Sequence, residues 1–131
     1  FNVLPMFEVD ASDEALFANL DWIKANAKDI DIFVKALLSV YRDLHKDPTI
    51  ISRETDPDGP IGQLPKEVLA ELDGFYADAV AGGLFDQNGG GEKAAKADLE
   101  WYHKAGHLTG KLSDLKIDDF WYMKPLKDAM N

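Results

Sequence analysis

Residues 27–46 carry the strongest structural signal in the chain, because their apolar side chains recur every three or four positions. That spacing places them along one face of an α-helix. Asp29 near the start, and Arg42 and His45 near the end, match the charges that the two ends of a helix favour. Asp47-Pro48 ends the helix, since the residue before a proline avoids the helical backbone region. The apolar positions are Ile30, Phe33, Val34, Leu37, Leu38, Tyr41 and Leu44.

Four further helices are predicted, over residues 12–26, 65–81, 92–105 and 124–130. Ser12 is placed to cap the first of them, and Pro65 suits the first position of the next. Gly82-Gly83 ends that helix, and Gly106 ends the one after it. The pattern places Leu37 on the buried face of the helix of residues 27–46. We therefore expect Leu37→Ala to lower the free energy of unfolding by about 2–5 kcal/mol.

Residues 2–10 predict a strand of about five residues that begins after Pro5, because proline lacks the N–H group that a central strand needs. A lone strand leaves its backbone groups without partners, and no second strand is evident downstream. The sum is a mostly α chain with one strand and about five helices.

Composition excludes several classes of function. The chain has 131 residues, which suits one domain, and a formal net charge of −10, which disfavours nucleic acids and anionic membranes as partners. It has no cysteine, so disulfides, thiolate metal sites and a cysteine nucleophile are excluded. No apolar run approaches the roughly 18–20 residues of a membrane span. There is no nucleophile elbow, P-loop or dinucleotide-binding motif.

The segment DQNGGG at residues 86–91 resembles the start of a calcium loop. Such a loop needs a bidentate Glu at its twelfth position, which here is Ala97, and its fifth position is Gly90, which has no side chain. The glycines could also hold an anion at the N-terminus of the helix that follows them. Glu92 would lie in the first turn of that helix and would repel the anion. We therefore interpret these residues as a flexible turn that leads into a helix.

Glu100, His103 and His107 have a spacing that zinc sites use. Gly106 is expected to break the helix between the two histidines, which favours surface histidines over a metal site. The tryptophans Trp22, Trp101 and Trp121 raise a similar choice between a stacking surface and the core. We expect Trp101 in the core and leave the other two open.

Glu8 and Asp10 are the strongest candidate ligand contacts, because acids at a strand end are where open α/β folds bind ligands. Strand alternation places Phe7 and Val9 on one face and the two acids on the other. The alternative is a solvated strand edge.

Taken in order, several segments resemble the C-terminal part of the periplasmic solute-binding proteins of ABC importers, in the branch that binds nitrate, sulfonates, taurine and thiamine precursors. They are FEVDAS, KAN, IDIFVKALLSVYRDLHKDP, GFYADAVAGGLFDQNGG and DLEWYHKAGHLTGKLSDLKIDDFWYMKPLKDAM. Two of these features are the most specific. One is the long helix that ends at a proline, and the other is the tail, in which Asp-rich residues precede an aromatic residue and then a helix that begins with Pro-Leu. The resemblance covers nearly the whole chain.

The resemblance implies a type II two-lobe α/β fold. Residues 1–11 would be the strand that crosses between lobes, and residues 12–131 the helices that pack on the first lobe. The lobe sheets have no counterpart in these residues, so we expect a C-terminal piece of a larger binding protein. The implied site residues are Phe7, Glu8 and Asp10 on the crossing strand.

The function that the resemblance implies is capture of a small anionic or heteroaromatic solute in the periplasm or outside the cell, and its delivery to a membrane permease. It implies neither an enzyme nor a cofactor or metal. Exposed helix faces would favour self-association. Two alternatives stay open: a self-contained helical module that binds another protein, and a small metal enzyme that uses Glu100, His103 and His107.

Overall fold

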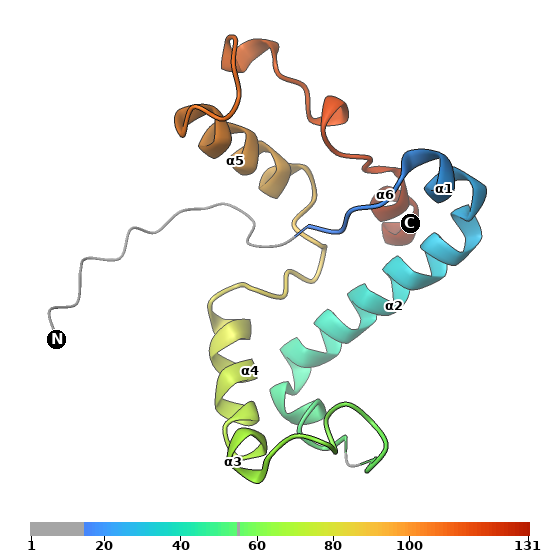
Figure 1. The fold of residues 1–131 in the computed structure, drawn as a ribbon, viewed down its shortest axis with the longest axis vertical. Helices are drawn as coiled ribbons and strands as arrows, with labels where there is room; N and C mark the ends of the chain where they lie inside the picture. Colours follow the sequence, from blue (N-terminus) through green and yellow to red (C-terminus); the bar gives the residue numbers. More distant parts are fainter. Residues whose placement is uncertain (1–14, 55) are drawn as a thin grey trace, which may run out of the picture.

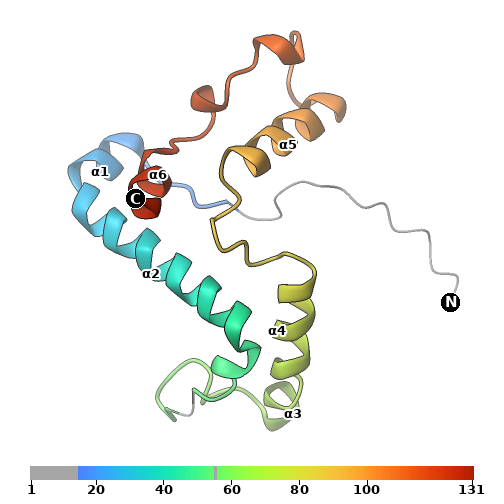
Figure 2. The same ribbon diagram turned by 180° about the vertical axis from the view of Figure 1, so that it is seen from behind.

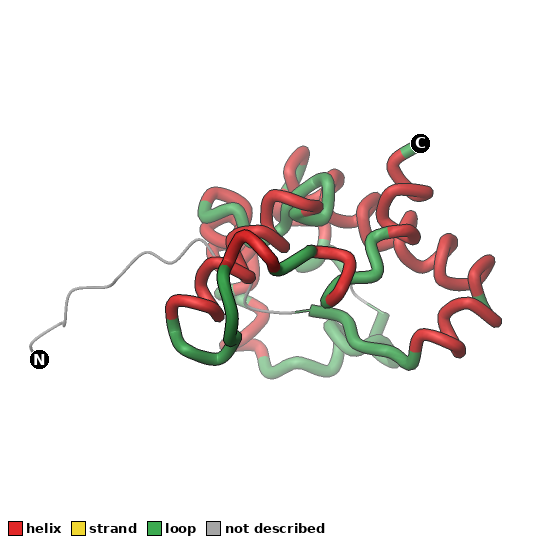
Figure 3. Tube along the Cα trace, turned by 90° about the horizontal axis from the view of Figure 1, so that it is seen from above, coloured by secondary structure: helices red, strands yellow, loops and turns green. Residues whose placement is uncertain are grey.

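A computed structural model describes residues 15–54 and 56–131 (Figure 1). Within those ranges the chain forms six α-helices joined by loops and 3-10 turns, and it contains no β-strand (Figure 3). The predicted mostly α fold is therefore confirmed for this part of the chain. The strand predicted over residues 2–10 lies outside it.

Helix α2 (Ala27–Lys46) is the longest element and has the predicted bounds. Its first turn carries Asp29 and its last turn His45, as the helix dipole favours. Asp47 adopts an extended conformation (φ −153°), as expected before Pro48, and the short 3-10 turn η1 (Pro48–Ile50) follows.

The first predicted helix is shorter than expected. Residues 15–19 are not helical, and α1 (Leu20–Ala25) begins at Leu20. The reason is a local cap: the Oδ1 atom of Asn19 accepts hydrogen bonds from the N–H groups of Asp21 (2.9 Å) and Trp22 (3.1 Å). These bonds satisfy first-turn donors that would otherwise lack partners. The prediction that residues 15–19 are helical was therefore wrong.

The predicted helix over residues 65–81 is two helices, α3 (Lys66–Leu69) and α4 (Leu72–Ala81). At the break, the Glu71 N–H donates to the carbonyl of Val68, three residues back (3.1 Å), so the turn tightens there. Pro65 stands just before α3 and is not its first residue.

Glycines end two helices in the predicted way. Gly83 follows α4, and Gly106 follows α5 (Gly91–Lys104), with φ angles of 80° and 79°. After α5, the N–H groups of Gly106 and His107 donate to the carbonyls of His103 (3.1 Å) and Tyr102 (2.9 Å). This pairing ends a helix at a residue in the left-handed conformation, which glycine adopts most easily. Helix α6 (Lys124–Met130) has its predicted bounds.

The helices form an open arrangement (Figures 1 and 2). Helix α4 lies near the C-terminal end of α2 and packs on η1, while α6 packs on α2. Helix α5 and the turns η2 (Leu112–Asp114) and η3 (Ile117–Asp119) form an arm that leaves α4 and returns to α6. The buried hydrophobic residues are Leu38, Leu44, Ala95, Leu99 and Met123.

Burial departs from the sequence pattern at three positions. Trp101, predicted in the core, is 39% exposed, so that prediction was wrong. The turns η2 and η3 cover the face of α5 that carries Leu99. Trp101 stands two residues after Leu99, about 200° around the helix axis, and therefore lies on the other side of the helix. Phe33 is also exposed. Leu37 is half-buried, whereas Leu38 beside it is 2% exposed.

Candidate functional site

The predicted ligand residues Phe7, Glu8 and Asp10 lie outside the described residues. The described residues offer two hollows, a polar junction at α2 and exposed apolar side chains as candidate sites.

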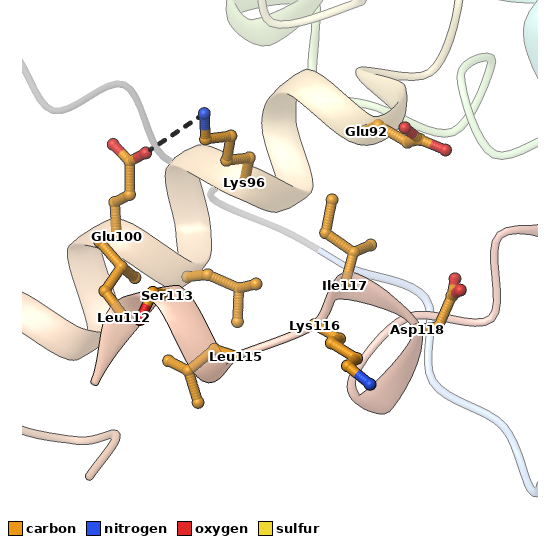
Figure 4. Close-up of a pocket in the computed structure, with 10 residues that line it drawn as sticks. Glu92, Lys96, Glu100, Leu112, Ser113, Leu115, Lys116, Ile117 and Asp118 are labelled. Atoms are coloured by element: carbon orange, nitrogen blue, oxygen red, sulfur yellow. Dashed lines mark ion pairs between the residues drawn. The ribbon is translucent and has the colours of Figure 1, made fainter. Parts of the chain in front are cut away.

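A hollow of about 680 Å³ lies between α5 and the turns η2 and η3 (Figure 4). Buried Leu99 belongs to its apolar lining, together with Leu112, Leu115 and Ile117. The charged lining residues are Glu92, Lys96, Glu100, Lys116 and Asp118. Lys96 and Glu100 face each other across one turn of α5, with Nζ and Oε1 3.9 Å apart.

The polar lining of this hollow consists mainly of charged side chains. The hydroxyl of Ser113, its one hydroxyl-bearing lining residue, donates to Asp114 Oδ1 (3.0 Å), and no histidine lines the hollow. The hollow therefore holds no Ser–His pair of the kind that hydrolases use. Apolar walls with charges of both signs suit contact with an amphipathic surface. A smaller hollow of about 430 Å³ lies at the start of α6, beside Trp121 and Tyr122.

An ion pair joins the first turn of α5 to α6 at the edge of the larger hollow. Lys127 Nζ lies 2.7 Å from Glu92 Oε1. The hydrogen bond and positive charge of Lys127 lower the pKa of Glu92, and Glu92 in turn raises the pKa of Lys127. Both side chains are exposed, so the pair adds little stability.

The histidines of α5 do not form a metal site with Glu100. His103 Nε2 lies 2.9 Å from the carbonyl oxygen of Gly110, and His107 follows the helix and packs its ring near that of Tyr102. The predicted helix break at Gly106 is thus confirmed. Across residues 15–54 and 56–131, no cluster of three or more His, Cys, Asp or Glu side chains could hold a metal ion.

The segment DQNGGG forms the turn that the sequence predicts. The Oδ1 atom of Asp86 accepts a hydrogen bond from the N–H of Asn88 (2.6 Å), and the Asp86 carbonyl accepts one from Gly89 (2.9 Å). Gly89, Gly90 and Gly91 all have positive φ angles, from 60° to 72°. Asp86 therefore shapes the turn that leads into α5.

The same turn is held against α2 by contacts that the sequence analysis missed. Arg42 Nε donates to the Gln87 carbonyl (3.1 Å), and His45 Nε2 lies 2.7 Å from the Phe85 carbonyl oxygen. A side chain at Gly89 would fit tightly, because a Cβ there would lie 3.0 Å from Leu126 Cδ1 and 3.4 Å from Leu38 Cδ2. We call Arg42, His45, Phe85, Gln87 and Gly89 the α2–loop junction.

Sequence reasoning assigned Arg42 and His45 to the helix dipole, since both stand near the end of α2. The junction joins residues 45 and 40 positions apart. Its one signal in the sequence is the run of glycines, because a glycine often marks a close approach of the backbone.

Large apolar side chains are exposed on many of the described helices and loops. Trp22 is among them, while Trp121 is half-buried. The exposed large apolar residues are Leu16, Phe17, Leu20, Trp22, Ile32, Phe33, Val40, Val68, Phe75, Leu84, Trp101, Tyr102, Leu112, Phe120, Tyr122 and Met130. These sixteen outnumber the five buried hydrophobic residues, which is unusual for a folded monomer.

Helix α2 carries a second apolar row beside its buried face. Ile32, Ala36 and Val40 are four residues apart, so they lie one above another, and all three are exposed. Leu44 is the next residue in that register and is only 1% exposed. The row is therefore covered at its C-terminal end and open over the rest. We call Ile32, Ala36 and Val40 the α2 row.

No family model, curated protein or solved structure matched the chain. Among the described residues, no helix has the length and apolar character needed to cross a membrane.

Proposed function

We propose that this chain supplies the C-terminal helices of a solute-binding protein of an ABC importer. The parent protein captures a small anionic or heteroaromatic solute between two lobes and delivers it unchanged to a membrane permease. It acts in the periplasm or on the outer face of the cell membrane. Residues 1–11 cross between the lobes, and Phe7, Glu8 and Asp10 contribute to the cleft.

The order of the segments supports this proposal. The long helix α2 ends at a proline stop, and α6 is a short helix that begins with Lys124-Pro125-Leu126. Both features belong to the segments that resemble the family most specifically.

The observation that carries the proposal is the exposed apolar surface. The described residues include five buried hydrophobic side chains and sixteen exposed large apolar ones, which another protein layer would cover. On the side of α4 and α5 these include Phe75, Leu84 and Trp101. A lobe sheet is the partner that the proposal places there, since helices cover the faces of α/β sheets.

A second candidate function is a self-contained helical module that binds another protein. The α2–loop junction favours it, because this junction, Leu38 and α6 give the described part a small packed centre of its own. Thermal unfolding of the isolated 131-residue chain separates the two: a sharp cooperative transition supports the module, and a broad one supports dependence on the lobes.

Solute binding is tested on the gene product that contains this sequence. We would measure its melting temperature with nitrate, bicarbonate, taurine, aromatic acids and pyrimidine precursors. A solute at 100 times its Kd stabilises by about 2.7 kcal/mol, which raises the melting temperature by several degrees. Glu8→Gln with Asp10→Asn should reduce that shift, and Asp58→Asn on an exposed loop should not. If no solute of these classes shifts the melting temperature, the proposal is wrong.

A further inference from the structure

One guanidinium group joins the α2–loop junction to helix α6. Arg42 Nε donates to the carbonyl of Gln87 (3.1 Å), and Arg42 Nη2 donates to the Sδ atom of Met130 (3.8 Å). The two acceptors belong to segments 45 and 88 positions away from Arg42 in the sequence. Because the guanidinium is planar and its donors have a fixed geometry, the same side chain holds both segments at once.

The contact to sulfur is the weaker of the two. A thioether sulfur is a weak acceptor, whereas a backbone carbonyl is a full one. The separation of 3.8 Å between Arg42 Nη2 and Met130 Sδ is also long beside the usual N–H···O range of about 2.7–3.2 Å. A charged donor therefore faces a partner that uses little of its strength. A better acceptor at this position would strengthen the tie, since hydrogen bonds from charged groups are the strong ones.

The methionines differ in how easily an oxidant reaches them. Met130 is 47% exposed, whereas Met123 is only 9% exposed. The third methionine, Met6, lies outside the described residues. Oxidation converts the apolar thioether of methionine into a polar sulfoxide. Because the oxidant must reach the sulfur, the fold favours this reaction at Met130 over Met123.

We propose that Met130 is an oxidation site for peroxides, and that its sulfoxide strengthens the tie between α6 and the α2–loop junction. In this step the O–O bond of the peroxide breaks and an S–O bond forms at Met130. The sulfur gives up two electrons, and the peroxide leaves as water or as an alcohol. The sulfoxide is reversible, because methionine sulfoxide reductases restore the thioether.

The new oxygen suits the donor that it meets. It extends from the sulfur and shortens the contact with Arg42 Nη2 to a charge-assisted hydrogen bond of about 2.7–2.9 Å. Met130 is exposed, so the polar oxygen keeps its contact with water and the cost of desolvation is small. Arg42 Nε keeps its bond to the Gln87 carbonyl, since the two contacts use different nitrogens.

The first experiment measures which methionine reacts. We would use Met6→Leu as the parent chain, treat it with hydrogen peroxide and follow the sulfoxide at each position by mass spectrometry of its peptides. Met130 should react several-fold faster than Met123. In urea the two rates should become equal, because the fold no longer covers Met123. Equal rates in the folded chain, or a faster reaction at Met123, would overturn the assignment of the site.

The second experiment measures what the sulfoxide does. Oxidation of the parent chain should raise its melting temperature by a few degrees, and a methionine sulfoxide reductase should reverse the rise. Peroxide should have no such effect on Met130→Leu. Arg42→Ala should abolish the rise. The matched control is Arg53→Ala, which removes an exposed arginine that pairs with Asp47 and should keep the rise.

A further variant tests the role of the fork if Arg42→Ala proves too unstable. Arg42→Lys keeps the positive charge but has one nitrogen for two acceptors, so it should show a smaller rise than the parent. The proposal is wrong if oxidation lowers the melting temperature or leaves it unchanged. It is also wrong if Arg42→Lys shows the full rise, or if the rise persists after the reductase has removed the oxygen.

Discussion

The two halves of α2 have a similar apolar pattern but differ in burial, because both buried residues of this helix lie in its C-terminal half, where Val40 is nevertheless exposed. The C-terminal half is held by the α2–loop junction and by η1, and its residues Leu38 and Leu44 are fully buried. In the N-terminal half, Ile32 and Phe33 are exposed. The comparison teaches that periodicity identifies which positions of a helix can be buried. Which of them are buried is decided by segments far away in the sequence.

The largest expected effect is on the buried half. Leu38→Ala should destabilise the chain by about 2–5 kcal/mol, because it leaves a cavity between α2, Gly89 and α6. Ile32→Ala, the same kind of truncation on the exposed half, should cost far less. Leu37→Ala should fall between them, since Leu37 is half-buried. Urea unfolding of the three variants checks this order, and equal losses for Leu38→Ala and Ile32→Ala would contradict the comparison.

A smaller effect is expected where the loop meets α2. Gly89→Ala places a side chain in a left-handed backbone conformation (φ 65°) and against Leu126 and Leu38. Gly91→Ala has the same backbone problem (φ 60°) but nothing within 4 Å of the new Cβ. The backbone change alone costs about 1–2 kcal/mol, so Gly91→Ala should lose that much and Gly89→Ala about 1 kcal/mol more. Similar losses for the two variants would mean that Gly89 is not a packing position.

The polar part of the junction should contribute less again. His45→Ala removes the contact to the Phe85 carbonyl oxygen at 2.7 Å, which should cost about 1 kcal/mol. Lys46→Ala, one residue along, removes only an exposed ion pair with Asp43 and should cost less. The melting temperatures of both variants decide the matter, and a larger loss for Lys46→Ala would refute the role given to His45.

Local sequence signals predicted much of this fold. The bounds of α2 and α6 and the glycine ends of α4 and α5 follow from apolar spacing and from glycine's freedom at positive φ. The start of α1 was mispredicted because two caps compete within eight residues, Ser12 and Asn19, and the side chain of Asn19 bonds the first turn. The break between α3 and α4 has no proline or glycine to announce it.

Burial and the candidate surfaces were less predictable. Trp101 is exposed on a helix whose main described neighbours are the short turns η2 and η3, and residue type does not reveal this feature of the tertiary structure. Arg42 and His45 looked like ordinary helix-end charges until the fold brought residues 85–87 to them. The α2 row escaped notice because it shares its helix with a second apolar face, so that spacing alone does not separate the covered row from the open one.

The smallest expected effect comes from the pair that ties α5 to α6. Lys127 lowers the pKa of Glu92, so the folded state holds this carboxylate in its charged form more tightly than the unfolded chain does. The stability that the pair supplies is fully present above the unfolded pKa, about 4.3 for Glu, and is lost as pH falls through the lowered folded value. Glu92→Gln should therefore be slightly less stable than the wild type near neutral pH and equal to it in strong acid. Chemical unfolding of both proteins at several pH values measures the difference, and Glu67→Gln on α3 is the matched control. If the difference in unfolding free energy between Glu92→Gln and the wild type persists in strong acid, the effect comes from packing. The ion pair then does not help to hold the arm to α6.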